Sequence, residues 1–233
     1  MTAGVIRRPG SGAPTRWSLP ISAAASLGLM VGGLLVSGLI GGIFPSPYES
    51  PAVVAEYFSH QSSAVRLQSP FLVGSAVALA GCSALLGARM SQIRQSRSAQ
   101  LALTASLLSA MMLALSGVSA WVLARGAERG FSPDVQTLHD LTFATGGVGH
   151  VVFLAMMVAS VAIGSPGLLP TAMVRSGKVI GALGAVALVG LVMPGLTVLL
   201  PVVRFPGLVW LILAAALIAR ADRDTGYRAG EVT

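Results

Sequence analysis

The sequence predicts an all-α membrane protein, a polytopic bundle of six transmembrane helices with both termini in the cytoplasm. Hydrophobic residues make up 54% of the chain and charged residues only 10%, whereas a soluble protein carries about 25% charged residues. Six segments are long and apolar enough to cross a bilayer. The basic residues gather on one side of these segments, which indicates the orientation.

The first apolar segment, Trp17–Phe44, follows a polar and basic stretch that resembles the start of a signal peptide. The apolar run is too long for a signal peptide and no small-residue cleavage site follows it, so we expect a retained first helix. The other five segments are Pro70–Met90, Leu101–Arg125, Leu141–Gly164, Val179–Leu200 and Gly207–Arg220. The last one spans a bilayer only if Val202–Pro206 belongs to it. Because lipid offers the backbone no hydrogen bonds, each segment is expected to be helical.

The orientation follows from a count of arginine and lysine on alternate sides of the six segments. Four lie on one side: Arg66, Arg125, Arg129 and Arg204. Eleven lie on the other: Arg7, Arg8, Arg16, Arg89, Arg94, Arg97, Arg175, Lys178, Arg220, Arg223 and Arg228. The positive-inside rule places the richer side, with both termini, in the cytoplasm. We expect residues 1–16 to be a disordered basic N-terminus, 17–220 a single membrane domain and 221–233 a flexible tail.

The first loop on the outward side predicts a short helix on the membrane surface. Ser50-Pro51 is a helix cap followed by proline at the first helical position, and the next residues are amphipathic. Glu56 and His60 are four residues apart and share a face of this helix. They are interpreted either as a solvated pair or as an acid–base or metal-ligand pair at the mouth of a cavity.

The fourth segment carries the other two histidines, His139 and His150. Phe131-Ser-Pro-Asp134 predicts the start of its helix, which places His150 about 13 Å below the outer edge of the hydrocarbon. An ionisable side chain at that depth is a functional hypothesis by default. The alternative is a neutral histidine that is hydrogen-bonded to the next helix. The third segment offers four serines as partners: Ser106, Ser109, Ser116 and Ser119.

Helical geometry limits what these histidines do together. His139 and His150 share a face but stand about 16 Å apart along the axis, so one metal ion or one haem cannot take both. Asp140 points away from His139, so a working site must include another element, with Glu56, Tyr57, His60, Arg66, Arg125 or Arg204 as contributors. A composite of Glu56, His60 and a group near His139 or Asp140 is the one metal site left open. We predict no metal and no cofactor.

A break in the fifth segment suggests a pocket. Met193-Pro194-Gly195 is expected to kink that helix close to the depth of His150, and proline there frees a carbonyl group. Gly146 and Gly149 allow close approach of a neighbouring helix or a ligand. A kink without a pocket is the alternative. The candidate ligand-binding residues are His150, Gly146, Gly149, Pro194, Tyr57 and Arg204.

Several short patterns together resemble a known type of protein. They are Ser50-Pro51-x-x-Val54-x-Glu56-Tyr57-Phe58, Leu138-His139-Asp140-Leu141, Leu168-Leu169-Pro170 and Trp210-Leu-Ile-Leu before an arginine-bearing tail. The chain is similar over residues 20–220 to the small six-helix membrane proteins of bacteria, especially actinobacteria, whose domain has no assigned function. The resemblance implies a six-helix fold in the bacterial plasma membrane and brings no catalytic residues.

Three classes of function fit the sequence. The first is a non-catalytic membrane protein that binds a lipid or small apolar molecule in an outward-facing pocket, or that serves as a partner subunit or homo-oligomer. The second is a membrane-embedded isomerase, cyclase or hydrolase, with catalytic candidates His139, Asp140, His150, Glu56 and His60. The third is a small-molecule transporter. A nucleic-acid partner is excluded because the arginines are scattered between apolar segments and form no basic surface.

Overall fold

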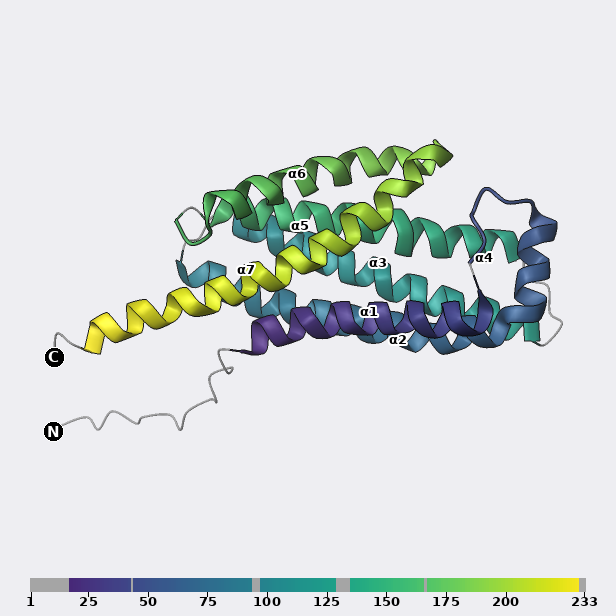
Figure 1. The fold of residues 1–233 in the computed structure, drawn as a ribbon, viewed down its shortest axis with the longest axis horizontal. Coiled ribbons are helices and arrows are strands. Elements are labelled where there is room, and N and C mark those ends of the chain that lie inside the picture. The colour runs from purple at the N-terminus through teal and green to yellow at the C-terminus, as the bar shows by residue number, and fades with distance from the viewer. Residues whose placement is uncertain (1–16, 43, 94–96, 129–134, 166, 231–233) are drawn as a thin grey trace, which may run out of the picture.

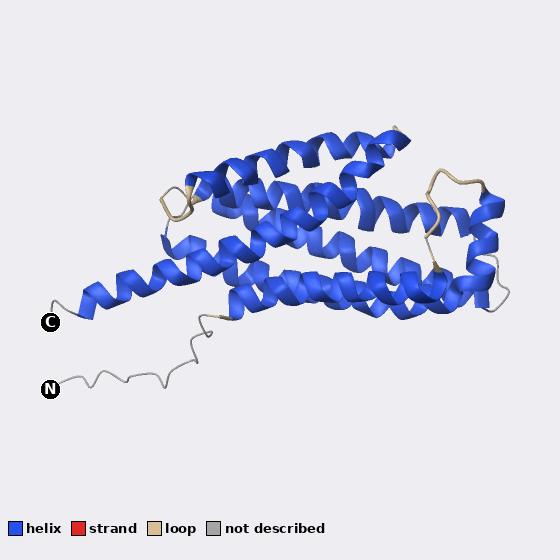
Figure 2. Ribbon diagram, in the orientation of Figure 1, coloured by secondary structure: helices blue, strands red, loops and turns tan. Residues whose placement is uncertain are grey.

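The computed structural model describes residues 17–42, 44–93, 97–128, 135–165 and 167–230, which are helical nearly throughout (Figures 1 and 2). The α-helices are α1 (Ser18–Gly41), α2 (Pro51–Ile93), α3 (Arg97–Glu128), α4 (Val135–Thr142), α5 (His150–Gly164), α6 (Thr171–Ala187) and α7 (Leu199–Gly230). A π-helical segment, η1 (Phe143–Gly149), joins α4 to α5. Two 3₁₀ turns, η2 (Leu188–Leu191) and η3 (Pro194–Val198), lie between α6 and α7.

The prediction of six apolar spans is confirmed. Within the described ranges, six helical stretches are long and apolar enough to cross a membrane, and the fourth, Val135–Gly164, is the most deeply buried of them. Large apolar side chains such as Leu39, Val77 and Met111 point away from the bundle and are exposed. An apolar surface of this extent is stable when lipid covers it. The fourth span therefore lies inside the bundle, and each of the others leaves half or more of its apolar stretch unburied and available to lipid.

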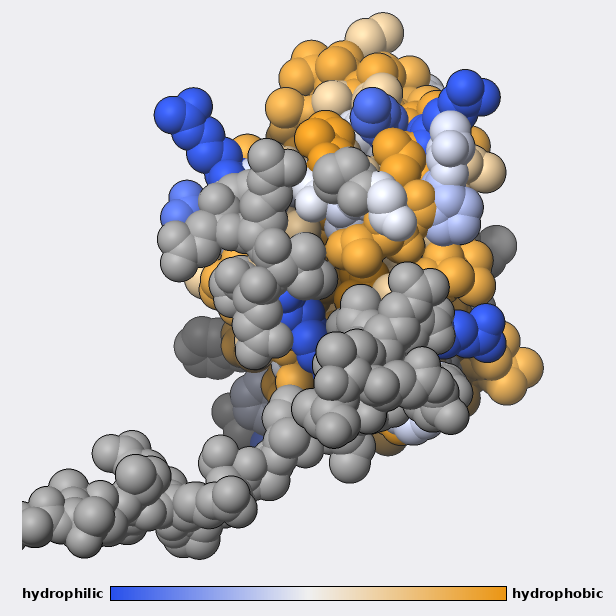
Figure 3. All heavy atoms as spheres, turned by 90° about the vertical axis from the view of Figure 1, so that its left-hand side faces the viewer, coloured by the Kyte–Doolittle hydropathy of each residue, from blue (hydrophilic) through white to orange (hydrophobic). Residues whose placement is uncertain are grey.

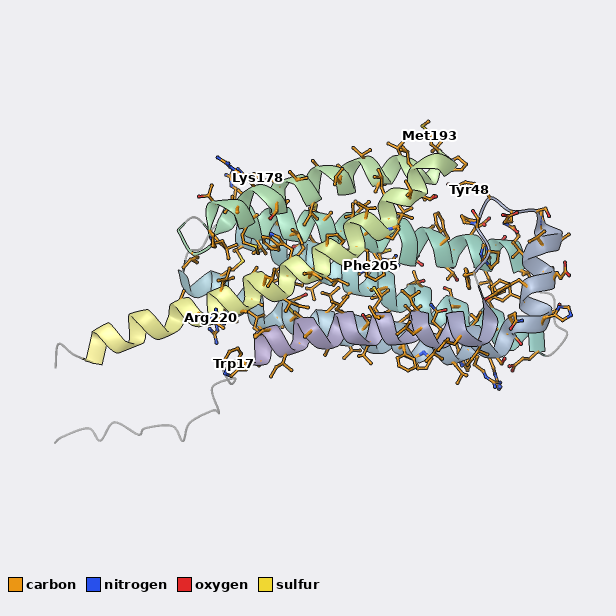
Figure 4. All side chains as sticks on the ribbon, viewed as in Figure 1. Trp17, Tyr48, Lys178, Met193, Phe205 and Arg220 are labelled. Atoms are coloured by element: carbon orange, nitrogen blue, oxygen red, sulfur yellow. The ribbon has the colours of Figure 1, made fainter. Side chains whose placement is uncertain are left out.

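Charges of opposite sign collect at opposite ends of the bundle. α1 begins and α7 ends at the same end (Figure 1), where Lys178 and Arg220 also lie (Figure 4). This basic end carries Arg89, Arg97, Arg175, Lys178 and Arg220, and Figure 3 looks onto it, with hydrophilic side chains in blue among hydrophobic ones in orange. The opposite, acidic end carries Glu49, Glu56, Glu128 and Asp140, together with Arg66 and Arg125, which both lie beside Glu128. The helix order therefore keeps the charge separation that the sequence displays.

The predicted surface helix is present at the acidic end. It is the first part of α2, which crosses that end of the bundle and turns at Gln61 (φ −117°, ψ 15°) into the second span (Figure 1). Ser50 caps it, since its Oγ accepts a hydrogen bond from the Val53 backbone N–H (3.4 Å). Val54 and Phe58 are buried against the end of α3. The second span thus starts earlier than the predicted Pro70, which lies inside α2.

The boundaries predicted for the fifth and sixth spans are wrong. Pro194 does not kink a helix that continues to Leu200, because the fifth span ends at Leu191 and the chain reverses direction at residues 192–193. Pro194 opens η3, the first turn of the sixth span, where its missing N–H leaves no hydrogen bond unmade. Pro194 therefore marks a hairpin, and a pocket cannot be derived from a kink there.

The sixth span is correspondingly longer than predicted. It runs from Pro194 to Ala221, and α7 remains helical beyond it as far as Gly230. Residues 221–230, which were expected to be part of a flexible tail, continue this helix. The expected disordered N-terminus (residues 1–16), the predicted helix start at 131–134 and residues 231–233 lie outside the described residues.

Candidate functional site

A cavity of about 380 Å³ lies toward the acidic end, between α1, α2, α3, α7 and the fourth span. The residues 44–47, which follow α1, cover it, and α7 diverges from α1 as it approaches its hairpin with α6 (Figure 1). Three of its lining residues are exposed: Leu34 on α1, Ser46 in the covering segment and Pro201 on α7. The mouth of the cavity therefore opens sideways between α1 and α7, beneath the covering segment.

One wall of the cavity is the π-helical segment, in which the regular α-helical hydrogen bonds of the fourth span are interrupted. Side chains from two other helices donate to carbonyl groups in this segment and in the residue just before it. Ser116 Oγ on α3 donates to the Thr142 carbonyl (2.9 Å). Arg204 Nη2 on α7 donates to the Gly146 carbonyl and, at 3.5 Å, to that of Gly147. The wider helical turn is thus held in place by both of its neighbours.

Arg204, a predicted ligand-binding residue, is the cation of this cavity. It lies ten positions after the start of the sixth span, and its neighbour Phe205 lies about midway along the bundle in Figure 4. No carboxylate among the described residues lies within ion-pair distance of the guanidinium. Its Nε is buried and has no hydrogen-bond acceptor among those residues. A charge in this position is costly unless something compensates it.

His139 lines the cavity, and its side chain is fully buried. Its ring stacks on Phe44 (centroids 5.3 Å apart, planes at 23°) and meets Phe58 edge-on. Nε2 lies 3.2 Å from the Pro45 carbonyl oxygen, which fixes it as the donor and leaves Nδ1 as an acceptor without a hydrogen-bond partner among the described residues. The imidazole therefore ties the covering segment to the fourth span.

Asp140, its neighbour, is exposed and does not line the cavity. Its Oδ1 stands 3.8 Å from His139 Nδ1 and accepts a hydrogen bond from Gln136 Nε2 at 2.9 Å. The carboxylate is thus held on the outer face of α4, beyond hydrogen-bond distance from the imidazole.

His150 lies deeper and does not line the cavity. Its Nδ1 is 2.9 Å from Ser109 Oγ, and that hydroxyl also lies 3.0 Å from the His150 carbonyl oxygen. This contact matches one of the two interpretations drawn from the sequence, a buried histidine that is hydrogen-bonded to a serine of the third segment. His150 thus joins α5 to α3 and stands apart from His139.

The other candidates lie outside the cavity walls. His60 and Glu56 are exposed, and His60 Nδ1 lies 3.0 Å from the Glu56 backbone oxygen. Tyr57 packs edge-on against Phe44 behind the cavity. Gly149 contacts Met112, and Pro194 lies in the hairpin; neither lines the cavity.

Among the described residues, no three His, Cys, Asp or Glu side chains stand together in a way that could hold a metal ion. The composite metal site of Glu56, His60 and a group near His139 or Asp140 is therefore not assembled there. Of the predicted ligand-binding residues, Gly146 and Arg204 line the cavity, together with the catalytic candidate His139.

Sequence reasoning missed much of this cavity. Its unpredicted walls come from α1, the segment after it, α2, α3, the fourth span and the start of the sixth: Met30, Leu34, Phe44, Pro45, Ser46, Pro47, Gln68, Leu72, Leu113, Ser116, Ala120, Thr142, Phe143, Gly147, Thr197, Leu200 and Pro201. The one signal in the sequence was the paired glycines 146 and 147 in an apolar span that also carries a histidine. The sequence of one helix does not determine which other helix packs against it.

Comparisons with protein-family models, curated proteins and solved structures find no match for this chain.

Proposed function

We propose that this protein binds a small apolar or amphipathic molecule in the cavity between α1 and α7, within the outer leaflet of a bacterial plasma membrane. The cavity volume of about 380 Å³ falls within the usual range for small-molecule sites, roughly 300–1,000 Å³. Its walls are mainly apolar, with a few polar groups that converge on the π-helical segment. This composition is typical of sites that bind apolar ligands and orient them by one end.

The orientation in this proposal follows the charges. The basic end belongs in the cytoplasm under the positive-inside rule, together with both termini, so the acidic end and the cavity face outward. The resemblance to small six-helix proteins of bacteria supports the same membrane.

The position of the mouth is the single observation that favours binding from the bilayer. Leu34 and Pro201 are exposed on the two helices that flank it, and both face the surface that lipid covers. A ligand that is dissolved in the membrane would reach the cavity without crossing the polar acidic end.

A matched pair of substitutions tests this function. Leu34 and Leu35 are adjacent exposed leucines on α1, and only Leu34 lines the cavity. We expect the neutral fluorophore 1-aminoanthracene to bind the purified wild type and Leu35→Trp, and to bind Leu34→Trp at least about tenfold more weakly, because one bulky ring blocks the mouth. Equal binding to all three proteins, or none to the wild type, contradicts the proposal.

His139 supports a second candidate, an enzyme that uses acid–base chemistry on an apolar substrate. Its Nδ1 has an unused lone pair at the wall of the cavity. If this is correct, cells that carry His139→Gln will accumulate a lipid-soluble substrate that cells with the wild type convert. Lipid extracts of the two strains that are identical by mass spectrometry would eliminate the enzyme.

A further inference from the structure

The unbalanced charge of Arg204 identifies the class of molecule that the cavity takes. Building on the proposed function, we propose that the ligand is a single-chain amphiphile with an oxyanion head, a carboxylate or a phosphate monoester. The head binds the Arg204 guanidinium, and the chain lies along the apolar walls toward α1.

Arg204 uses only some of its hydrogen-bond donors. A guanidinium has five N–H donors. Those on Nη2 are used by the carbonyls of Gly146 and Gly147. Nε and Nη1 have no acceptor among the described residues, and Nε is buried. The arginine is therefore anchored through one nitrogen and keeps donors for another partner.

The positive charge of Arg204 is not neutralised by any described carboxylate. The described carboxylates at the acidic end are exposed or paired elsewhere; Glu128, for example, lies 2.7 Å from Arg66. The carbonyl groups that Arg204 contacts are dipoles without net charge, so they satisfy hydrogen bonds without neutralising the cation. A ligand oxyanion in the cavity would supply the missing charge, and charge-assisted hydrogen bonds of this kind are among the strongest in proteins.

The other donors of the cavity are occupied or uncharged; Gln68 and Ser46, which also line it, carry only neutral groups. The hydroxyls of Ser116, Thr142 and Thr197 each donate to a backbone carbonyl, at 2.9, 2.8 and 2.7 Å. His139 donates through Nε2 to Pro45. Arg204 is the one arginine or lysine among the residues that line the cavity. An anionic head therefore has one strong attachment point.

The volume of the cavity limits the size of the ligand. At about 380 Å³ the cavity is near the lower end of the range for small-molecule sites, which suits one chain and leaves no room for a two-chain phospholipid. Apolar side chains line the cavity together with Arg204, among them Leu200, Leu113, Met30 and Leu34, and Leu34 is exposed at the mouth. A chain along this path would reach the lipid between α1 and α7.

The test compares two probes with the same chain, one with a charged head and one with a neutral head. cis-Parinaric acid and its methyl ester fluoresce alike and share one polyene chain. We expect the wild type, in neutral detergent at mildly alkaline pH, to bind the acid at least about tenfold more tightly than the ester. Arg204→Met should abolish this preference. Arg125→Met, which removes a cation at the same end but outside the cavity, should keep it.

The outcomes separate the two proposals. Equal binding of acid and ester by the wild type would overturn the oxyanion head, while loss of both probes in Leu34→Trp would still support a binding cavity. No binding of either probe by the wild type would overturn both. If Arg204→Met does not fold, the preference of the wild type decides, and Arg204→Lys, which retains the charge, should keep most of it.

Displacement of the bound acid distinguishes the sources of the head. Palmitate and hexadecyl phosphate should displace it, and the stronger of the two identifies the preferred oxyanion. Inorganic phosphate should not displace it, because it has no chain. Displacement by inorganic phosphate or by phosphatidylglycerol at the same concentration would refute the single-chain amphiphile.

Discussion

Gly146 in the fourth span lies against Ser116 of α3, so close that a Cβ on residue 146 would collide with the serine side chain. The same hydroxyl donates to the Thr142 carbonyl, four residues earlier in the fourth span. The close approach of the two helices and the hydrogen bond that supports the π-helical segment therefore depend on one glycine and one serine. Together they shape the wall that faces Arg204.

Gly146→Ala should destabilise the protein by about 1–3 kcal/mol, because the added methyl group forces α3 and the fourth span apart. Gly28→Ala is the control, since a Cβ at Gly28 meets nothing within 4 Å. That change should leave stability unchanged or raise it by about 0.5–1 kcal/mol, the usual preference of a helix for alanine. Thermal unfolding in detergent measures both. Equal melting temperatures for the two variants would refute the tight contact.

The contact between Ser109 and His150 should be structural. Ser109→Ala removes the hydroxyl from both His150 Nδ1 and the His150 carbonyl, and leaves Nδ1 only the Ser109 backbone carbonyl at 3.2 Å. We therefore expect a loss of about 1–3 kcal/mol in unfolding free energy. Ser106→Ala, on the same helix, removes only a bond to the Leu103 carbonyl of its own helix and should cost less. Both variants should bind 1-aminoanthracene like the wild type. A stable Ser109→Ala protein that no longer binds the probe would instead place His150 in the site.

Tyr48 should control how fast a ligand leaves. Tyr48 directly follows the covering segment, residues 44–47. Its hydroxyl donates to the Gly190 carbonyl, which ties that segment to the hairpin between α6 and α7 (Figure 4). Tyr48→Phe removes this tie without changing the cavity walls, so the dissociation rate of a bound probe should rise several-fold while stability changes little. Stopped-flow fluorescence measures the rate. An unchanged rate would show that the covering segment does not limit exchange.

The orientation is testable with two serines in matched settings. Ser59 at the acidic end and Ser176 at the basic end are both exposed, and each hydroxyl donates to the carbonyl three residues before it. Cys82 is the one cysteine in the sequence, so Cys82→Ala provides a background without thiols. A membrane-impermeant maleimide applied to intact cells should label Ser59→Cys and spare Ser176→Cys. The reverse pattern would invert the topology and place the cavity toward the cytoplasm.

The sequence by itself determined the number and helical nature of the spans and the helix that crosses the acidic end. These depend on local properties: the length of an apolar run, the need of a backbone in lipid for internal hydrogen bonds, and the Ser50-Pro51 cap. Local chemistry also misled at Pro194. Proline ends a helical hydrogen-bond pattern, but the same residue fits a kink or the first turn of a new helix.

Only the tertiary structure decided which groups meet. Depth along a helix can be read from the rise per residue, but the side of the helix that faces a given neighbour cannot when apolar residues surround it on all sides. His139 and His150 share a face of an ideal helix, yet one lines the cavity and the other joins α5 to α3 across the π-helical turn. The contact of Arg204 with Gly146, 58 positions away in the chain, exists because α7 packs across the fourth span.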